Sequence, residues 1–211
     1  MLDRELSCCT ATTQAECLYP SQITRTPTPP AERAPQPTFV IDVDEPVLGG
    51  PLYLSSHALA HDPAVLRALG ITHVINVTPD HPNAPGMEHP HHEGIVSYLR
   101  IPVVDSVDVD IGQYFAQACE FIDRAFDRPR GARAPAVLVH CRHGQSRSGT
   151  IVAAWLMHRS RSEHGVAAGL ASATAAVRYL KECRPRVSPN GGFLKQLEEA
   201  AADGDSFARG V

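Results

Sequence analysis

A cysteine and an arginine lie six positions apart in residues 140–148, His-Cys-Arg-His-Gly-Gln-Ser-Arg-Ser. The apolar run 136–139 precedes the pair and a helical pattern follows over 148–158, which predicts a loop between a buried strand and a helix. Backbone N–H groups and a helix N-terminus attract anions in such a loop, and Arg147 can bind two phosphate oxygens at once. The same positive field is expected to hold Cys141 as a thiolate. The segment therefore predicts a phosphate site with a sulfur nucleophile.

A thiolate held against a phosphate ester can displace the alcohol and form a phosphocysteine, which water then hydrolyses. The segment resembles the His-Cys-x5-Arg-Ser/Thr signature of protein tyrosine phosphatases, and its Ser-Arg-Ser ending is similar to the small atypical dual-specificity branch. The resemblance implies that Cys141 is the nucleophile and that Arg147 binds the phosphate. It also implies that Ser148 donates to the departing thiolate and that His140 supports the loop. The phosphate loop that binds the substrate is then Arg142, His143, Gly144, Gln145, Ser146 and Arg147.

Two residues of this segment have alternative roles. Ser148 can be a serine of the first helical turn that bonds only local backbone groups. His143 departs from the family, which often has a small residue or a glutamate there. Its imidazole can contact the substrate or remain a solvated side chain without a catalytic role.

An acidic stretch upstream supplies candidates for a general acid. Residues 101–111 follow a predicted strand and contain Asp105, Asp108 and Asp110. The resemblance favours Asp105, because the first aspartate after this strand donates the proton in dual-specificity phosphatases. On chemistry alone Asp108 and Asp110 remain open, and either can instead cap the helix expected from about Ile111 to Phe126.

The resemblance covers about residues 38–200. Residues 52–77 look like the opening strand, helix and second strand of the family, and residues 184–197 are similar to its closing segment. This closing segment contains Asn190, which in relatives helps to hold the phosphate loop. Capping of the last helix is the other role that we expect for Asn190, and the two roles are compatible.

The order of elements predicts an α/β domain of the protein tyrosine phosphatase type. About five strands are expected in one central mixed sheet with helices on both faces, at residues 39–43, 52–54, 72–77, 97–102 and 136–140. Three helices follow the phosphate loop. One of them is expected at 166–181, where alanines favour close packing on the helix that carries Trp155.

Composition predicts a single folded domain in a chain of 211 residues with 43% hydrophobic content. Residues 1–37 are rich in proline and threonine without apolar periodicity, so we expect a disordered arm that acts as a tether. We expect the catalytic domain over 38–202 and a flexible tail over 203–211. The charged start and the lack of a long apolar run predict neither a signal peptide nor a membrane anchor.

The sequence predicts no cofactor and no metal. The histidines of the proline-rich segment 79–93 are expected on a surface loop, and their spacing matches no zinc pattern. These residues are His81, His89, His91 and His92. Six cysteines without zinc-site or disulfide-scaffold spacing indicate a reducing compartment. Of these, Cys119 and Cys183 are expected in the core, and reversible pairing of one with Cys141 under peroxide is a separate hypothesis.

These features predict a cysteine-dependent phosphatase acting on phosphotyrosine and on phosphoserine or phosphothreonine in proteins. The alternatives are a non-protein substrate (phosphoinositide, phosphoglucan or an RNA 5' phosphate) and a phosphopeptide-binding module with little turnover. No lysine lies in the loop, which disfavours a phosphoinositide. The net charge of −4 gives no signature of nucleic acid as a partner, and phosphoproteins are the expected partners. We expect a cytoplasmic or nuclear location, while the oligomeric state stays open.

Overall fold

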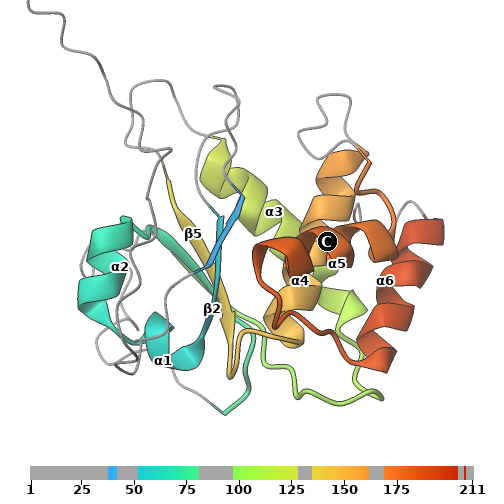
Figure 1. Ribbon diagram of the computed structural model, residues 1–211, viewed down its shortest axis with the longest axis horizontal. Coiled ribbons are helices and arrows are strands. Elements are labelled where there is room, and N and C mark those ends of the chain that lie inside the picture. Colours follow the sequence, from blue (N-terminus) through green and yellow to red (C-terminus); the bar gives the residue numbers. More distant parts are fainter. Residues whose placement is uncertain are drawn as a thin grey trace, which may run out of the picture. The chain divides into compact units, whose positions relative to one another are not determined.

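Figure 1 shows the computed structural model of the chain. The structure describes residues 52–80, 97–127, 135–161, 169–203 and 207, together with the backbone of 38–41. All of them belong to the unit Pro35–Val211. The predicted N-terminal arm and the four loop histidines lie outside the described residues, so the expectations for them stay predictions.

A five-stranded sheet with the order β1-β2-β5-β3-β4 forms the centre of this unit. Its strands are β1 (Thr38–Ile41), β2 (Leu52–Ser56), β3 (His73–Asn76), β4 (Ser97–Arg100) and β5 (Val137–Cys141). Strand β1 runs antiparallel to β2, and the other four strands are parallel to one another. The mixed sheet predicted from the sequence is confirmed, and each strand overlaps its predicted range.

Helices cover both faces of the sheet, as predicted (Figure 1). They are α1 (His57–Ala60), α2 (Pro63–Leu69), α3 (Phe115–Phe126), α4 (Arg147–Ser160), α5 (Ala173–Cys183) and α6 (Gly191–Asp203), with a 3-10 turn η1 (Gly112–Tyr114) before α3. Because side chains alternate along a strand, each strand supplies both faces. Leu138 of β5 packs in the cluster with Leu66 of α2, whereas Val137 and Val139 join the larger cluster formed by α3 to α6.

The helix predicted at 166–181 begins later than expected. Gly169 has a φ of 87°, and Ser172 is extended and accepts a hydrogen bond from the N–H of Ala175, so α5 begins at Ala173. A serine N-cap satisfies an otherwise unpaired amide and thereby sets the helix start. The prediction was wrong at this end, because alanine content shows where a helix is tolerated but not where it is capped. The expected packing of this helix on α4 is confirmed.

The larger cluster extends beyond the end of α6. Phe207 is buried, and its ring lies 6.2 Å from the ring of Phe115 between centroids. The tail 203–211 was expected to be flexible. Beyond Asp203 the structure describes one residue of this tail, Phe207. Cys119 is buried as predicted, whereas Cys183 is only partly buried.

Asp123 ties α3 to α4. Its Oδ1 accepts a hydrogen bond of 2.9 Å from the Nε1 of Trp155, and its Oδ2 lies 3.2 Å from the Nε2 of His158. The guanidinium of Arg159 adds an ion pair at 3.6 Å. The partly buried carboxylate of Asp123 thus contacts three side chains from one face of α4.

Replacement of Asp123 by alanine is expected to lower the free energy of unfolding by about 1–3 kcal/mol, because the buried Trp155 N–H loses its acceptor. Urea titration measures this. Glu120→Ala is the matched control on the same helix, since it removes only an exposed ion pair with Arg124 and should cost less than about 1 kcal/mol. Equal losses in the two variants would contradict the role assigned to Asp123.

Candidate active site

The segment 142–146 connects the end of β5 to the first turn of α4, as the sequence predicted. Strand β5 lies between β2 and β3, and its last residue is Cys141. The carboxyl ends of the four parallel strands share one edge of the sheet, which is the edge where open α/β proteins bind ligands. The loop therefore lies at the edge where a binding site is expected.

Gly144 allows the loop to fold back on the sheet. Its φ is 66°, a left-handed conformation that side chains disfavour. A Cβ at this position would lie 2.5 Å from the carbonyl oxygen of Ser55 at the end of β2. The loop consequently packs against β2 with no room for a side chain.

The sulfur of Cys141 is buried and accepts two hydrogen bonds. The Oγ of Ser148 donates at 3.2 Å, and the N–H of Gly144 donates at 3.3 Å. The bond from Ser148 is the contact that the sequence analysis expected. It shows that this serine does more than bond local backbone groups.

Arg147 has an almost fully buried side chain, 7% exposed. Its Nη1 donates to the carbonyl oxygen of Val103 at 3.0 Å, and its Nε lies 3.7 Å from the Oδ2 of Asp105. Within the described residues, this buried Nε–H has no hydrogen-bond acceptor. A buried donor without an acceptor is costly, so a bound anion that approaches the guanidinium would relieve that cost.

Of the three candidate aspartates in residues 101–111, Asp105 is the one with contacts to the phosphate loop. Its Oδ1 accepts a hydrogen bond of 2.7 Å from the Oγ of Ser146 and one of 2.9 Å from the Nδ2 of Asn190. The carboxylate is 37% exposed. Asp108 and Asp110 are exposed as well, and Asp110 accepts from the N–H of Gln113 at 3.2 Å. The helix expected from about Ile111 begins at Phe115 after the turn η1, with Tyr114 and not an aspartate at its N-cap.

Asn190 joins the loop to α6, and both contacts expected for it are present. Its N–H donates to the Oγ of Ser146 at 3.2 Å, so it holds the loop. Its Oδ1 accepts from the N–H of Phe193 at 2.9 Å, so it also caps α6. Asn190, Ser146 and Asp105 therefore form one hydrogen-bonded group.

Arg184 is a loop contact that the sequence analysis did not single out. Its Nε donates to the carbonyl oxygen of Gly144 at 3.0 Å. Burial lowers the pKa of Arg184 and repulsion from Arg186 lowers it further, while the charge of Cys141 acts in the opposite direction. The guanidinium thus lies within electrostatic range of the sulfur. In the sequence, the one indication of a role for Arg184 was its place at the start of the closing segment 184–197.

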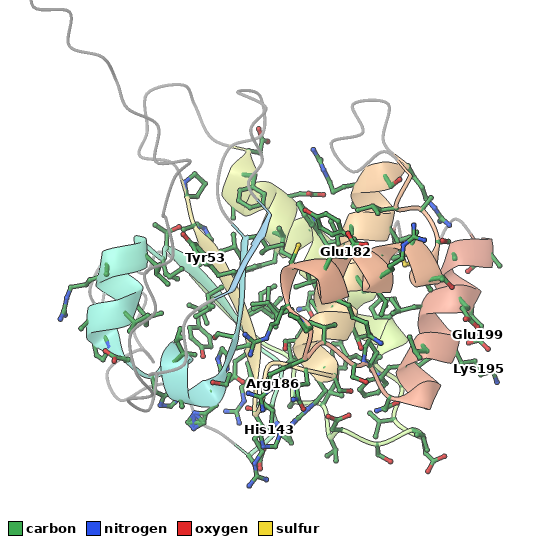
Figure 2. All side chains as sticks on the ribbon, in the orientation of Figure 1. Tyr53, His143, Glu182, Arg186, Lys195 and Glu199 are labelled. Carbon is green, nitrogen blue, oxygen red and sulfur yellow. The ribbon has the colours of Figure 1, made fainter. Side chains whose placement is uncertain are left out.

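The remaining loop residues contribute backbone or lie at its rim. The carbonyl oxygen of Gln145 accepts from Ser188 N–H at 3.1 Å, and that of Arg142 accepts from His57 N–H at 3.3 Å. The side chains of Arg142 and His143 are exposed. Figure 2 shows His143 at the outer end of the loop, beyond the carboxyl end of β5.

His140 is buried behind the loop, with its Nε2 3.5 Å from the hydroxyl oxygen of Tyr98. Burial raises the pKa of Tyr98 to about 12, although a hydrogen bond with Asn76 acts against this. The hydroxyl therefore stays neutral beside the imidazole. This position fits a supporting role for His140 rather than contact with a ligand.

The described residues contain no group of three or more histidine, cysteine or acidic side chains that could hold a metal ion. In this same part of the chain, no helix has the length and apolar character to cross a membrane.

Gly144→Ala is expected to lower the free energy of unfolding by at least about 2 kcal/mol, because the new methyl group meets Ser55 and the left-handed backbone is strained. It should also abolish the stabilisation of the fold by added inorganic phosphate. Thermal unfolding with and without phosphate measures both effects. Gly191→Ala is the control, since nothing lies within 4 Å of its Cβ position. Unchanged phosphate stabilisation in Gly144→Ala would contradict the loop geometry.

Comparison with known proteins gives consistent matches. A family model described as dual specificity phosphatase, catalytic domain, matches residues 52–203. The chain is 37% identical over 148 residues to dual specificity protein phosphatase 1 of Arabidopsis thaliana, over 70% of this chain and 64% of the relative. It is 40% identical over 157 residues to dual specificity protein phosphatase 4 of Homo sapiens, over 71% of this chain and 34% of the relative.

Among solved structures, DUSP15 has a TM-score of 0.59 and 34% identity, over 78% of this chain and 92% of that chain. The chain spans just under two thirds of the length of the plant relative and about a third of the human one.

Proposed function

The chain belongs to the dual specificity phosphatase catalytic-domain family, and from that membership we propose that it hydrolyses phosphate monoesters on proteins through a phosphocysteine intermediate. The observation that carries this proposal is one connected group of residues at the sheet edge. Ser148 and Gly144 bond the sulfur of Cys141, and the buried Arg147 lies beside Asp105. Each chemical role that the reaction needs has a residue in this group.

Binding of the substrate is the first step. The phosphate enters the loop, where backbone N–H groups and the N-terminus of α4 favour an anion. Arg147 offers its Nε–H, which has no acceptor among the described residues, to a phosphate oxygen. The bound phosphorus then lies against the sulfur of Cys141.

Transfer to the enzyme follows. The thiolate of Cys141 attacks phosphorus, an S–P bond forms, and the P–O bond to the leaving group breaks. Asp105 donates a proton to the leaving oxygen, which departs as an alcohol or phenol. The Oδ1 of Asp105 already accepts two hydrogen bonds, so its Oδ2 is the oxygen we assign to carry this proton.

Hydrolysis of the phosphocysteine completes the cycle. Asp105, now a carboxylate, takes a proton from water as the water oxygen attacks phosphorus. The S–P bond breaks, and inorganic phosphate and the thiolate are the products. Ser148 donates a hydrogen bond to the sulfur as its negative charge returns, along the 3.2 Å contact described above.

The surface around Asp105 supports a protein substrate. Among the described residues, the exposed large apolar side chains are Val104 and Val107, both 55% exposed, and they lie on either side of Asp105 in the chain. They would contact an apolar part of the substrate, such as a phosphotyrosine ring or a neighbouring peptide side chain. A catalytic thiol needs a reducing environment, so we propose action in the cytoplasm or nucleus.

Cys141→Ser is expected to lower the hydrolysis of an aryl phosphate more than about 10³-fold, because a serine hydroxyl is not ionised as a thiolate is. Phosphate-dependent stabilisation of the fold should persist, since the loop and Arg147 remain. Initial rates in the presence of a chelator measure turnover, and wild type should keep its full rate there. Cys183→Ser, remote from the loop in sequence and only partly buried, is the control. Phosphopeptide binding by a wild-type chain without turnover would favour the binding-module alternative.

Asp105→Asn is expected to slow hydrolysis of a phosphothreonine peptide by about 10²-fold or more, because an alkoxide leaves poorly without a proton. An aryl phosphate with a good leaving group should lose much less, since its phenolate departs unprotonated. The ratio of the two rates is the measurement. Asp108→Asn, at an exposed residue of the same segment, should leave both rates unchanged. A selective loss in Asp108→Asn instead would move the acid to that residue.

A further inference from the structure

We propose that Gln196 of α6 is a positioning residue, whose side-chain amide holds the segment 105–112 so that Asp105 stays at the phosphate loop. The inference rests on the proposed function, because it concerns the general acid of that reaction. Gln196 lies 91 positions after Asp105 in the chain and contacts neither the phosphate loop nor Cys141 through any hydrogen bond described for it.

The amide of Gln196 makes three hydrogen bonds to this one segment. Its Oε1 accepts from the backbone N–H groups of Ile111 and Gly112, both at 2.8 Å. Its Nε2 donates to the carbonyl oxygen of Val109 at 2.8 Å. Both acceptor sites of the amide oxygen and one of its two N–H donors are therefore used on the backbone of neighbouring residues. Such a pattern fixes the position and orientation of a backbone that lies outside the sheet.

A glycine one helical turn earlier lies directly on the same segment. A Cβ at Gly192 would lie 1.9 Å from the carbonyl oxygen of Val107, so the first turn of α6 and the segment touch backbone to backbone. Residues 192 and 196 are four apart and thus share one face of α6. That face is the surface on which the segment rests.

The contacts follow one another in order along both parts of the chain. Asn190 bonds Asp105, Gly192 meets Val107, and Gln196 bonds Val109 and the two residues after Asp110. Figure 1 shows the green segment after β4 passing below the beginning of α6, in agreement with these contacts. The start of α6 therefore acts as a template along which the acidic segment is laid.

The segment depends on this template because its own hydrogen bonds are local. The N–H of Ser106 donates to the carbonyl oxygen of Val104, just before the segment, and the N–H of Val109 donates to the carbonyl oxygen of Ser106. Ordering each backbone residue costs about 1–2 kcal/mol in conformational entropy, and short local turns offset little of that. Loss of the Gln196 bonds would let the segment sample other positions, because Asp105 would then be held only through its side-chain contacts with Ser146, Asn190 and Arg147. A misplaced general acid loses rate only where the leaving group needs its proton.

The test compares Gln196→Ala with Lys195→Ala on two substrates, a phosphothreonine peptide and an aryl phosphate with a good leaving group. Gln196→Ala should lower kcat on the peptide about tenfold or more and change kcat on the aryl phosphate less than about threefold. Lys195 is the matched control, because its exposed side chain pairs with Glu199 at 3.6 Å on the same helix (Figure 2). Lys195→Ala should change neither rate.

Two further measurements separate positioning from a general loss of stability. In the Asp105→Asn background, Gln196→Ala should add little, because the acid it positions is already absent. Gln196→Glu keeps the acceptor for Ile111 and Gly112 but loses the donor to Val109, so its effect should lie between wild type and Gln196→Ala. Equal loss on both substrates, or full additivity with Asp105→Asn, would overturn the proposal.

Hydrogen exchange gives a readout that does not depend on turnover. The amides of Ile111 and Gly112 should exchange at least tenfold faster in Gln196→Ala than in wild type, with amides of β5 unchanged. If wild type shows no turnover but these amides respond, the proposed function fails and the anchoring stands. If turnover is present and the exchange of Ile111 and Gly112 is unaltered, Gln196 does not hold the segment.

Discussion

Strand β5 pairs on both sides, with β2 and with β3, and the position of Cys141 depends on this pairing. All five residues of the strand are buried; Val137, Val139 and Cys141 belong to the larger hydrophobic cluster and Leu138 to the smaller one. A shift of the register by one residue would send each apolar side chain to the opposite face, which the packing on both faces resists. The sulfur therefore has one position relative to the ends of β2 and β3. The loop can fold around that position because Gly144, which has no side chain, packs directly against the backbone of Ser55.

The phosphate loop is held from outside by segments far from it in sequence. Arg184 and Ser188 bond its carbonyl oxygens, and Ser146 receives a bond from the N–H of Asn190. The first two contacts satisfy backbone carbonyl groups of the loop, and the third is made to the hydroxyl of Ser146. In the proposed function, this anchoring would hold the loop in one shape before a phosphate arrives.

The buried charge of Arg147 and the carboxylate of Asp105 stabilise each other. Arg147 is buried, which is costly for an unpaired cation, and Asp105 offsets part of that cost at 3.7 Å. Asp105 is in turn held by Ser146 and Asn190. In the proposed reaction, a phosphate that enters the loop would compete with Asp105 for the guanidinium. Substrate binding would thereby be coupled to the surroundings of the proposed general acid.

The fold class, the five strands and the loop between β5 and α4 could be predicted from the sequence, because apolar periodicity and neighbouring residues determine such local structure. The start of α5 could not, since the alanine pattern continues through residues that Ser172 excludes from the helix. Likewise, the periodicity gave no sign that Phe207 would be buried beside Phe115. In both cases a specific contact, the Ser172 cap or the Phe115–Phe207 pair, determined the structure where the periodicity did not.

The spacing of Cys141 and Arg147 was sufficient by itself to predict the loop of the candidate site, because both residues belong to one strand-loop-helix unit. The choice among Asp105, Asp108 and Asp110 rested on family resemblance, and only the tertiary structure brings one of them to Arg147. Arg184 and Gln196 were not identified as important, because their partners lie 40 and more than 80 residues away. The sequence by itself pointed to Cys141 as the proposed nucleophile and to its loop as the proposed anion site, because both features are local. The tertiary structure decided which distant side chains complete them, because sheet order and helix packing bring those residues together.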